Sequence, residues 1–460
     1  MSDRPSEVYE FGAFRLDVGE RTLRRLKGRE RIVIPDKAFR TLVHLVRNSG
    51  ALVAKDTIHS AVWPGVFVED GNIGKVIHII RSALADRGSD SAYIETVPKH
   101  GYRFIADVTR IETSAAVASV PEAVQQSRSP AYDLYIRGKV KADSENVDDA
   151  DEAIALLETA VGLDPSCAGA FAQLARAYNT RAFKFTSQAE GRRFRENADV
   201  ALTKALDLDP NLAEAHFARG LILWTQAKGF PHEHAIRSFK KALALEPDAD
   251  ETHHQLSMVY SHVGLLDEAL AHVEHAIDLN PNNTMARFRV GVYTAWQCRF
   301  EDALGVLKAV PSDVSPFLVD RVRAEVYVQL GRLDKAGAIV DAYLAEHPGD
   351  AGGSLTSVKA LLLARTGETQ AAARAIGRAI ELGTGFGHFH HTAYNIAATY
   401  AALQQPGEAV TWLEATADDG FPCYPCFERD PNLDSLRRQP RFVGMMSLLR
   451  KRWTRFRETA

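Results

Sequence analysis

The spacing of apolar residues changes character several times along the chain, and the first region has a period of two. Residues 8–34 hold four short segments with strand-like composition, "VYEF", "FRLD", "TLRRL" and "RIVI", which Gly12, Gly19 and Gly28 separate. Alternation of apolar and polar residues is typical of β-strands, and glycine often marks the turns between them. We therefore predict four short strands at this end of the chain.

A helical period follows the strands. Residues 35–50 begin with a Pro-Asp pair and end at a glycine, as helices often do, and residues 54–65 predict a second short helix that Pro64 ends. Residues 70–85 predict a third helix with one apolar stripe, formed by Ile73, Ile77, Ile80 and Leu84. Residues 92–106, "YIETVPKHGYRFIAD", alternate again on both sides of a basic tip. This last pattern predicts a β-hairpin.

From residue 131 onward the sequence repeats with a period of about 34 residues. Five copies have an alanine near the start of the second helix, Gly264, Gly331 and Gly367 stand five positions before three of these alanines, and prolines close several of the units. The alanines are Ala269, Ala303, Ala336, Ala372 and Ala409. This pattern resembles the tetratricopeptide repeat, and we predict about eight units, with an insertion, "RAFKFTSQAEG", in the copy that begins at Ser166. Such arrays form a superhelix with a concave surface that binds partners.

Charge differs between the two regions. Residues 1–110 hold 18 Lys and Arg against 14 Asp and Glu, whereas the remainder holds 37 against 45, although the whole chain has a net charge of −4. Residues 111–130 separate these regions and are rich in Ala, Ser, Val and Gln, which indicates a linker. A basic first region favours a polyanionic partner there.

Four blocks of the first region resemble the OmpR/PhoB-type winged-helix DNA-binding domain, over about residues 8–107. They are "FRLDVGERTLRRL", "AFRTLVHLVRNSGALVAKDTIHSAVWP", "VEDGNIGKVIHIIRSAL" and "YIETVPKHGYRF". The closing ETV-x-x-x-GYRF motif is the most specific of them. The resemblance implies that the hairpin is the wing, with its basic tip on the phosphates and in the minor groove, and that the third helix reads the major groove.

The resemblance also assigns DNA contacts to particular residues. Base or phosphate contacts fall to Asn72, Lys75, His78 and Arg81, with Ser82 on the same outward face, a backbone contact to Trp63, and wing contacts to Lys99, His100 and Arg103. The loop at residues 64–70 corresponds to a family loop that can touch RNA polymerase. Gly71 and His78 stand where many members carry Arg. Fewer permanent charges suggest weaker binding by one domain, or reliance on several copies that act as a homo-oligomer on DNA.

The predicted fold is multidomain, an α+β winged helix-turn-helix followed by an all-α tetratricopeptide-repeat superhelix. We expect a DNA-binding domain over residues 1–110, a linker over 111–130, the repeat array over 131–418 and a capping segment over 419–460. The winged helix begins near residue 8, which leaves no room for a phosphoacceptor receiver domain.

The predicted function is a sequence-specific transcriptional regulator that binds double-stranded promoter DNA and whose repeat groove senses or docks an unknown protein, peptide or small molecule. The alternative is a repeat-based scaffold with only non-specific DNA contact.

Other classes of protein find little support. The sequence has no apolar run close to the roughly 18–20 residues that cross a membrane, and no signal-peptide pattern, so we expect a cytoplasmic protein without a membrane partner. The four cysteines fit no disulfide framework. No catalytic motif or nucleotide-binding loop appears, so we expect no enzymatic activity and no cofactor.

Two groups of residues nevertheless suggest chemistry near the C-terminus. Cys423-x-x-Cys426 supplies half of a zinc site, and His388, His390 and His391 would supply the other half if that repeat folds back. We favour packed thiols in a loop, because Pro422 and Pro425 flank them, and predict no metal site. A thiol-redox or metal-dependent enzyme centred on these cysteines is a third, less favoured hypothesis.

Two further features have plainer interpretations. The histidines of one repeat are interpreted as packing or solvated residues: His253, His254, His262, His272 and His275. Residues 437–458 form a basic amphipathic pattern, which we interpret as a helix that caps the array.

Overall fold

The chain divides into two compact units, Met1–Val124 and Gln125–Ala460. The computed structural model describes residues 7–459 with internal gaps at 19–21, 27–30, 33–35, 55–56, 59–75, 78–79, 82, 85–92, 98–100, 112–128, 143–145, 187–189, 281–282 and 311–313. Each unit is described by itself. The finer domain boundaries, including the linker over 111–130, stay a prediction.

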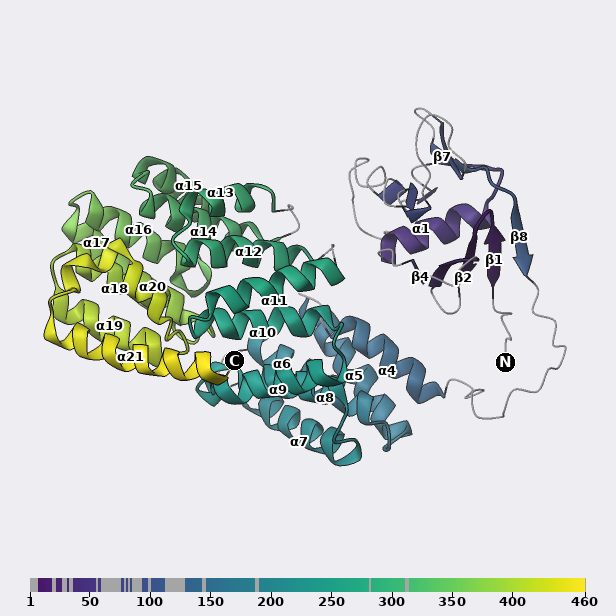
Figure 1. Cartoon of the computed structure of the whole chain (residues 1–460), viewed down its shortest axis with the longest axis horizontal. Coiled ribbons are helices and arrows are strands. Elements are labelled where there is room, and N and C mark those ends of the chain that lie inside the picture. Colours follow the sequence, from purple (N-terminus) through teal and green to yellow (C-terminus); the bar gives the residue numbers. More distant parts are fainter. Residues whose placement is uncertain are drawn as a thin grey trace. The chain divides into compact units, whose positions relative to one another are not determined.

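The first unit begins with a five-stranded antiparallel sheet (Figure 1). In spatial order its strands are β4 (Arg31–Ile32), β3 (Thr22–Arg25), β2 (Phe14–Asp17), β1 (Val8–Phe11) and β8 (Val108–Ile111). The four predicted strands are therefore confirmed. The β8 strand was not predicted, because its four residues "VTRI" lie next to the presumed linker and show little periodicity.

A second, three-stranded sheet contains the predicted hairpin. Its order is β5 (Leu52–Ala54), β7 (Gly101–Phe104) and β6 (Ile94–Val97), and both pairings are antiparallel. Gly101 lies where the backbones come closest, since a Cβ built there would be 2.0 Å from the carbonyl oxygen of Val53. Only glycine permits that approach. The hairpin is confirmed, although its tip at residues 98–100 lies outside the described residues.

Helix α1 (Asp36–Arg47) and the predicted third helix bury their apolar stripes in the core of this unit. Ile77, Ile80 and Leu84 are each at most 2% exposed, so the described part of the predicted stripe is confirmed. The amide of Leu84 donates to the carbonyl oxygen of Ile80 at 2.9 Å, as in an α-helix. Ile73 lies outside the described residues.

The second unit contains sixteen described helices that pack as eight successive pairs, followed by a C-terminal segment. The pairs are α4 (Pro130–Lys141) with α5 (Val147–Leu163), α6 (Ala168–Phe185) with α7 (Arg192–Leu208), α8 (Ala213–Leu223) with α9 (His232–Leu245), α10 (Asp250–His262) with α11 (Leu266–Leu279), α12 (Thr284–Trp296) with α13 (Phe300–Lys308), α14 (Pro316–Gln329) with α15 (Leu333–Glu346), α16 (Ser354–Arg365) with α17 (Thr369–Gly383), and α18 (Phe389–Ala402) with α19 (Pro406–Asp418). The segment holds α20 (Tyr424–Arg429) and α21 (Pro440–Thr459).

The repeat signature has a direct structural cause. All five alanines named above lie in the second helices of their pairs and are fully buried, because the two helices cross too closely there for a larger side chain. Gly264, Gly331 and Gly367 have φ angles of 83°, 70° and 85° in the turns between paired helices. Glycine adopts this left-handed conformation without strain. The first part of the predicted insertion, up to Phe185, extends α6.

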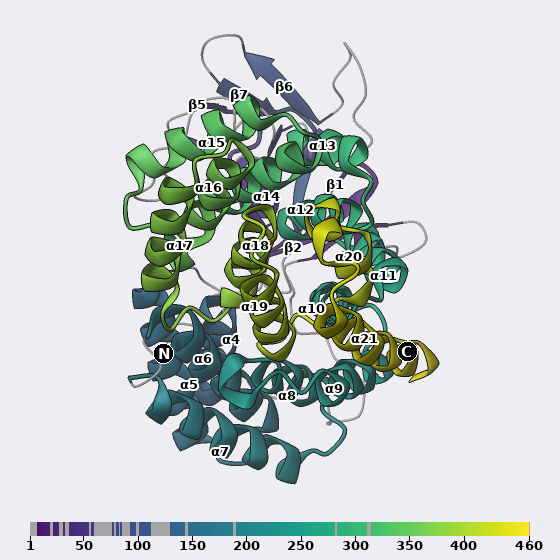
Figure 2. The same cartoon turned by 90° about the vertical axis from the view of Figure 1, so that its left-hand side faces the viewer.

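The C-terminal segment packs against helices much earlier in the chain (Figure 2). The indole nitrogen of Trp453 in α21 donates to the carbonyl oxygen of Gly264 at 2.9 Å, and Arg455 contacts Glu233 of α9 at 3.0 Å. The predicted apolar stripe of α21 is buried at Phe442, Met445 and Leu449. Helix α21 therefore covers apolar surface and joins the end of the array to its middle.

The loop after α19 makes a second connection to the same region. The amide nitrogen of the Gln226 side chain donates to Asp419 Oδ1 at 3.1 Å, and His232 Nε2 lies 3.0 Å from the carbonyl oxygen of Gly420. Figure 2 shows α18 and α19 between α17 and α10. The inner side of the predicted superhelix is thus partly filled by its own last repeat.

No helix in the described ranges is both long enough and apolar enough to cross a membrane.

Two glycine substitutions test the closure of the array. Gly264 and Gly331 both have positive φ, but a Cβ at Gly264 would lie 2.5 Å from Cδ of Pro425, whereas a Cβ at Gly331 meets nothing within 4 Å. We expect Gly331→Ala to lower the free energy of unfolding by about 1–2 kcal/mol through backbone strain. Gly264→Ala should cost about 1–3 kcal/mol more, because it also displaces Pro425. Urea unfolding followed by circular dichroism measures both, and equal losses would contradict the closed arrangement.

Candidate functional site

Arg81 connects the predicted reading helix to the wing. Its Nη2 donates to the carbonyl oxygen of Ile94 at 2.7 Å and to Thr96 Oγ1 at 2.8 Å, both in β6. The guanidinium group therefore fixes the hairpin relative to the helix. Its predicted contact with DNA is untested and stays a prediction, but this positioning role was not visible in the sequence.

Arg103 lies on the hairpin itself. It is directly opposite Glu95 in the β6–β7 register, and its Nη1 is 2.9 Å from Glu95 Oε2. Both side chains are well exposed, so this ion pair is worth at most about 1 kcal/mol. Glu95 therefore holds Arg103 only weakly.

The other predicted DNA contacts lie outside the described residues. They are Trp63, Asn72, Lys75, His78, Ser82, Lys99 and His100, together with the loop at 64–70. Their roles stay predictions.

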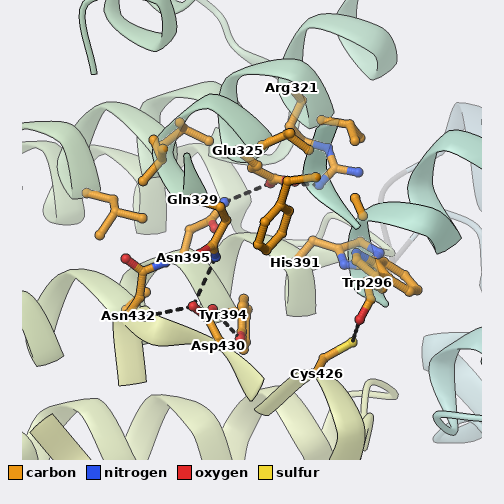
Figure 3. A pocket seen from close by; sticks show the side chains of 18 of the residues that line it. Trp296, Arg321, Glu325, Gln329, His391, Tyr394, Asn395, Cys426, Asp430 and Asn432 are labelled. Atoms are coloured by element: carbon orange, nitrogen blue, oxygen red, sulfur yellow. Dashed lines mark hydrogen bonds and ion pairs between the residues drawn. The ribbon is translucent and has the colours of Figure 1, made fainter. Parts of the chain in front are cut away.

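The repeat unit contains a pocket between α12, α14, α16 and α18 on one side and the C-terminal segment on the other (Figure 3). It has an empty volume of about 840 Å³, which includes space open to solvent. Apolar and aromatic side chains form much of its wall, among them Trp296, Val322, Val326, Leu361 and Phe421.

An ion pair and an amide lie at one end of this pocket. Arg321 Nη1 is 2.9 Å from Glu325 Oε1, and both side chains are largely buried. The side-chain amide of Asn395 donates to the same Glu325 oxygen at 3.1 Å and to Ser357 Oγ at 3.1 Å. Helices α14, α16 and α18 therefore meet through one polar network.

A second network surrounds the buried Asp430. The Gln329 amide donates to Asp430 Oδ1 at 2.9 Å, and the Tyr394 hydroxyl donates to Oδ2 at 2.6 Å. Burial and the Asp430 charge raise the pKa of Tyr394 well above its usual range, so this hydroxyl remains a donor at neutral pH. The carboxylate joins the C-terminal segment to α14 and α18 (Figure 3).

Four histidines gather beside the pocket. His262 ends α10, while His388, His390 and His391 stand at the start of α18, and one ring nitrogen from each lies within 4.8 Å of the others. Burial lowers the pKa of His262, His388 and His391 well below the usual range, so these imidazoles are neutral at pH 7. Of the two interpretations, solvated or packing, His262 follows the second, and it packs against His390 and His391 of a distant repeat. Nothing in the sequence of its own repeat indicates that His262 contacts histidines of α18.

The two C-terminal cysteines lie in a helical turn rather than in a loop. Cys423 precedes α20, Cys426 lies within it, and their sulfurs are 2.9 Å apart. Pro425 is compatible with this turn because the first residues of a helix need no amide donor. Neither sulfur belongs to the histidine cluster, so within the described residues the cysteines do not join His388, His390 and His391 in the zinc site that the sequence left as a less favoured alternative.

Comparisons with known proteins agree with the fold. Residues 28–104 match the family described as "Transcriptional regulatory protein, C terminal", and residues 250–283 match the tetratricopeptide repeat. The chain thus joins a winged-helix domain of OmpR/PhoB type to tetratricopeptide repeats, which confirms both resemblances.

Two similar relatives are transcriptional regulators. HilA of Salmonella typhimurium is 29% identical over 118 residues, which cover 24% of this chain and 21% of HilA. The activator CadC of Escherichia coli is 32% identical over 104 residues, which cover 21% of this chain and 20% of CadC. The matching part therefore spans only about a fifth of either relative.

A solved structure of a thermophilic tetratricopeptide protein from Thermus thermophilus is 26% identical to part of the array. The match covers 38% of this chain and 86% of that protein, with a TM-score of 0.32.

Thiol labelling tests the environment of the cysteines. Cys423 and Cys426 are buried, and burial raises the pKa of Cys426 well above its usual range, whereas Cys167 is partly exposed. Because the thiolate is the reactive form, we expect iodoacetamide to modify Cys167 much faster than Cys426 in the native protein. Mass spectrometry of the peptides, with urea-unfolded protein as the control, gives the rates. Equal native rates would instead support a reactive thiol pair.

Proposed function

We propose that this protein is a sequence-specific DNA-binding transcriptional regulator whose repeat array receives a signal. The observation that carries the proposal is the winged-helix unit itself, in which Arg81 holds the wing against the predicted reading helix. The proposed domain bounds are 1–110 for DNA binding, 131–418 for the array and 419–460 for the segment that closes it.

The proposed DNA contacts combine two kinds of interaction. A helix in the major groove reads base edges through side chains such as Asn72, Lys75 and His78, while basic wing residues neutralise phosphates. Arg103 is suited to the second role, because its present partner Glu95 is exposed and exchangeable. The loop at 64–70 is proposed to touch RNA polymerase.

The proposed signal site is the pocket of the repeat unit. Its apolar wall and its two polar networks suit a small molecule, or the side chain of a peptide, that carries both apolar and hydrogen-bonding groups. A ligand there touches α14, α16, α18 and the C-terminal segment at once. Binding would then alter how the array closes, and through it the oligomeric state or the number of winged helices on DNA.

Binding rather than catalysis is the proposed activity of the array. Arg321, Glu325 and Asp430 are engaged with neighbouring side chains, and the Cys426 thiol is buried with a raised pKa. These groups therefore hold structure together and are poorly placed to act as a nucleophile or base.

Selection of genomic DNA fragments by the full-length protein tests this function. We expect a defined sequence motif, and a steep loss of affinity with added salt. Lys75→Ala should weaken binding and, if Lys75 contacts phosphate, reduce the slope of log affinity against log salt concentration by about 1. Arg24→Ala is the matched control, since Arg24 is an exposed arginine on the five-stranded sheet.

Two outcomes would count against the regulator. Equal binding to all fragments would favour the scaffold with non-specific DNA contact. Equal losses in Lys75→Ala and Arg24→Ala would show that the reading helix is assigned wrongly.

A further inference from the structure

The four-histidine cluster joins two repeats that are far apart in the sequence. His262 comes from α10 in the fourth helix pair, and His388, His390 and His391 come from α18 in the eighth. Nothing in the periodicity of a tetratricopeptide repeat requires imidazoles at these positions. The cluster exists only because the last pair folds back onto the middle of the array.

Hydrogen bonds orient two of the imidazoles toward the centre of the cluster. His262 Nδ1 lies 2.8 Å from the carbonyl oxygen of Met258, and His390 Nδ1 lies 2.8 Å from that of Asp419. A carbonyl oxygen only accepts hydrogen bonds, so each Nδ1 must carry the proton and each Nε2 the lone pair. This is the arrangement in which a metal-binding histidine donates its other ring N–H to a backbone carbonyl.

Three nitrogens of the cluster lack partners of their own. Nε2 of His262, Nε2 of His390 and Nδ1 of His388 are buried and have no hydrogen-bond partner within the described part of the protein. His262 and His390 are almost completely buried, at 2% and 0% exposure. Buried polar atoms are rarely left in this state, and three at one place indicate a ligand that accepts their lone pairs.

Aromatic rings enclose the cluster and keep its surroundings apolar. The ring centroid of Trp224 is 4.9 Å from that of His262, and those of Phe230 and Phe421 are 5.6 Å from His390 and 5.2 Å from His391 respectively. If the cluster were only aromatic packing, Phe side chains would fill the space without unsatisfied nitrogens. The nitrogen atoms therefore need a separate explanation.

Charges of both signs lie around the cluster. The positive charges of Arg289 and Arg321 lie close enough to lower the pKa of His388, but Arg321 is paired with Glu325. Asp419 Oδ2 lies 3.7 Å from His390 Nδ1, and this oxygen is also buried without a hydrogen-bond partner in the described residues. A carboxylate behind a ligating histidine stabilises a metal site.

The ligand chemistry narrows the choice of ion. Neutral imidazole suits zinc, copper, nickel and iron, whereas calcium and magnesium require oxygen ligands. Zinc binds histidine nitrogen at about 2.0–2.1 Å, so two ligands of a tetrahedral ion are about 3.4 Å apart. The four nitrogens lie within 4.8 Å of one another, so metal binding requires that they move closer by up to about 1.4 Å.

We propose that His262, His388, His390 and His391 bind one divalent transition-metal ion, with zinc as the expected ion, and that this ion clamps α18 to α10. His391 also lines the pocket, so the metal would set the shape of one pocket wall. This inference does not depend on DNA binding, because it concerns the closure of the array alone.

Metal titration of the untagged full-length protein tests the proposal. After treatment with EDTA, calorimetry with Zn²⁺ should show one site per chain, and saturation should raise the thermal midpoint. Co²⁺ should give the intense visible absorption of a tetrahedral site. His390→Asn should weaken Zn²⁺ binding by at least about tenfold and abolish this absorption.

Two further variants keep the result interpretable. His391→Asn changes a partly exposed ligand, and it serves if His390→Asn fails to fold in the metal-free state. His272→Gln is the matched control, because His272 lies in α11, contacts His253 at 2.8 Å and is outside the cluster. The control should bind Zn²⁺ like the wild type. Absence of stoichiometric binding, or equal weakening in the control and the ligand variants, would overturn the proposal.

Discussion

Each helix pair of the array can bury its apolar side only against another pair, and the rest of the second unit follows from this constraint. The alanines at the crossings, such as Ala269 and Ala409, let neighbouring helices approach closely. The last pair has no successor to cover it, and α20 and α21 supply the missing surface. Their packing against the turn at Gly264 continues this burial across the array, so the end of the chain meets its middle.

This closure also brings together the residues of the pocket and of the histidine cluster. The pocket and the histidine cluster both lie where α18 and the C-terminal segment meet earlier helices, and His391 belongs to both. Asp430 provides a further connection, since its carboxylate accepts hydrogen bonds from Gln329 and Tyr394. A ligand bound as proposed would act on contacts between distant repeats, and local binding would thereby change the whole array.

The first unit depends on a different kind of contact. Its two sheets and α1 share one apolar core, while Arg81 fixes the wing through a backbone carbonyl and a hydroxyl of β6. Loss of this side chain would therefore disturb the relation between helix and wing even where it touches no DNA. For that reason Arg81 is a poor single probe of base recognition, and Lys75 is a better one.

Local sequence patterns alone predicted much of the fold of this protein. Strand alternation, the ETV-x-x-x-GYRF motif, and the Ala and Gly positions of the repeats predicted the two folds, because they reflect contacts within one element or between adjacent helices. The β8 strand was missed, since four residues carry too little periodicity to identify a strand. The helical turn at Cys423 was also missed, because two nearby prolines resemble a loop.

Only the tertiary structure shows which residues contact one another across the array. No spacing rule connects His262 with His390, or Trp453 with Gly264, since each pair is separated by more than three repeats of sequence. Such contacts depend on the cumulative curvature of many helix pairs, to which every crossing contributes a small rotation. The sequence therefore showed residues that could bind a ligand or a metal ion, but it did not show that they assemble into a pocket and a four-histidine cluster.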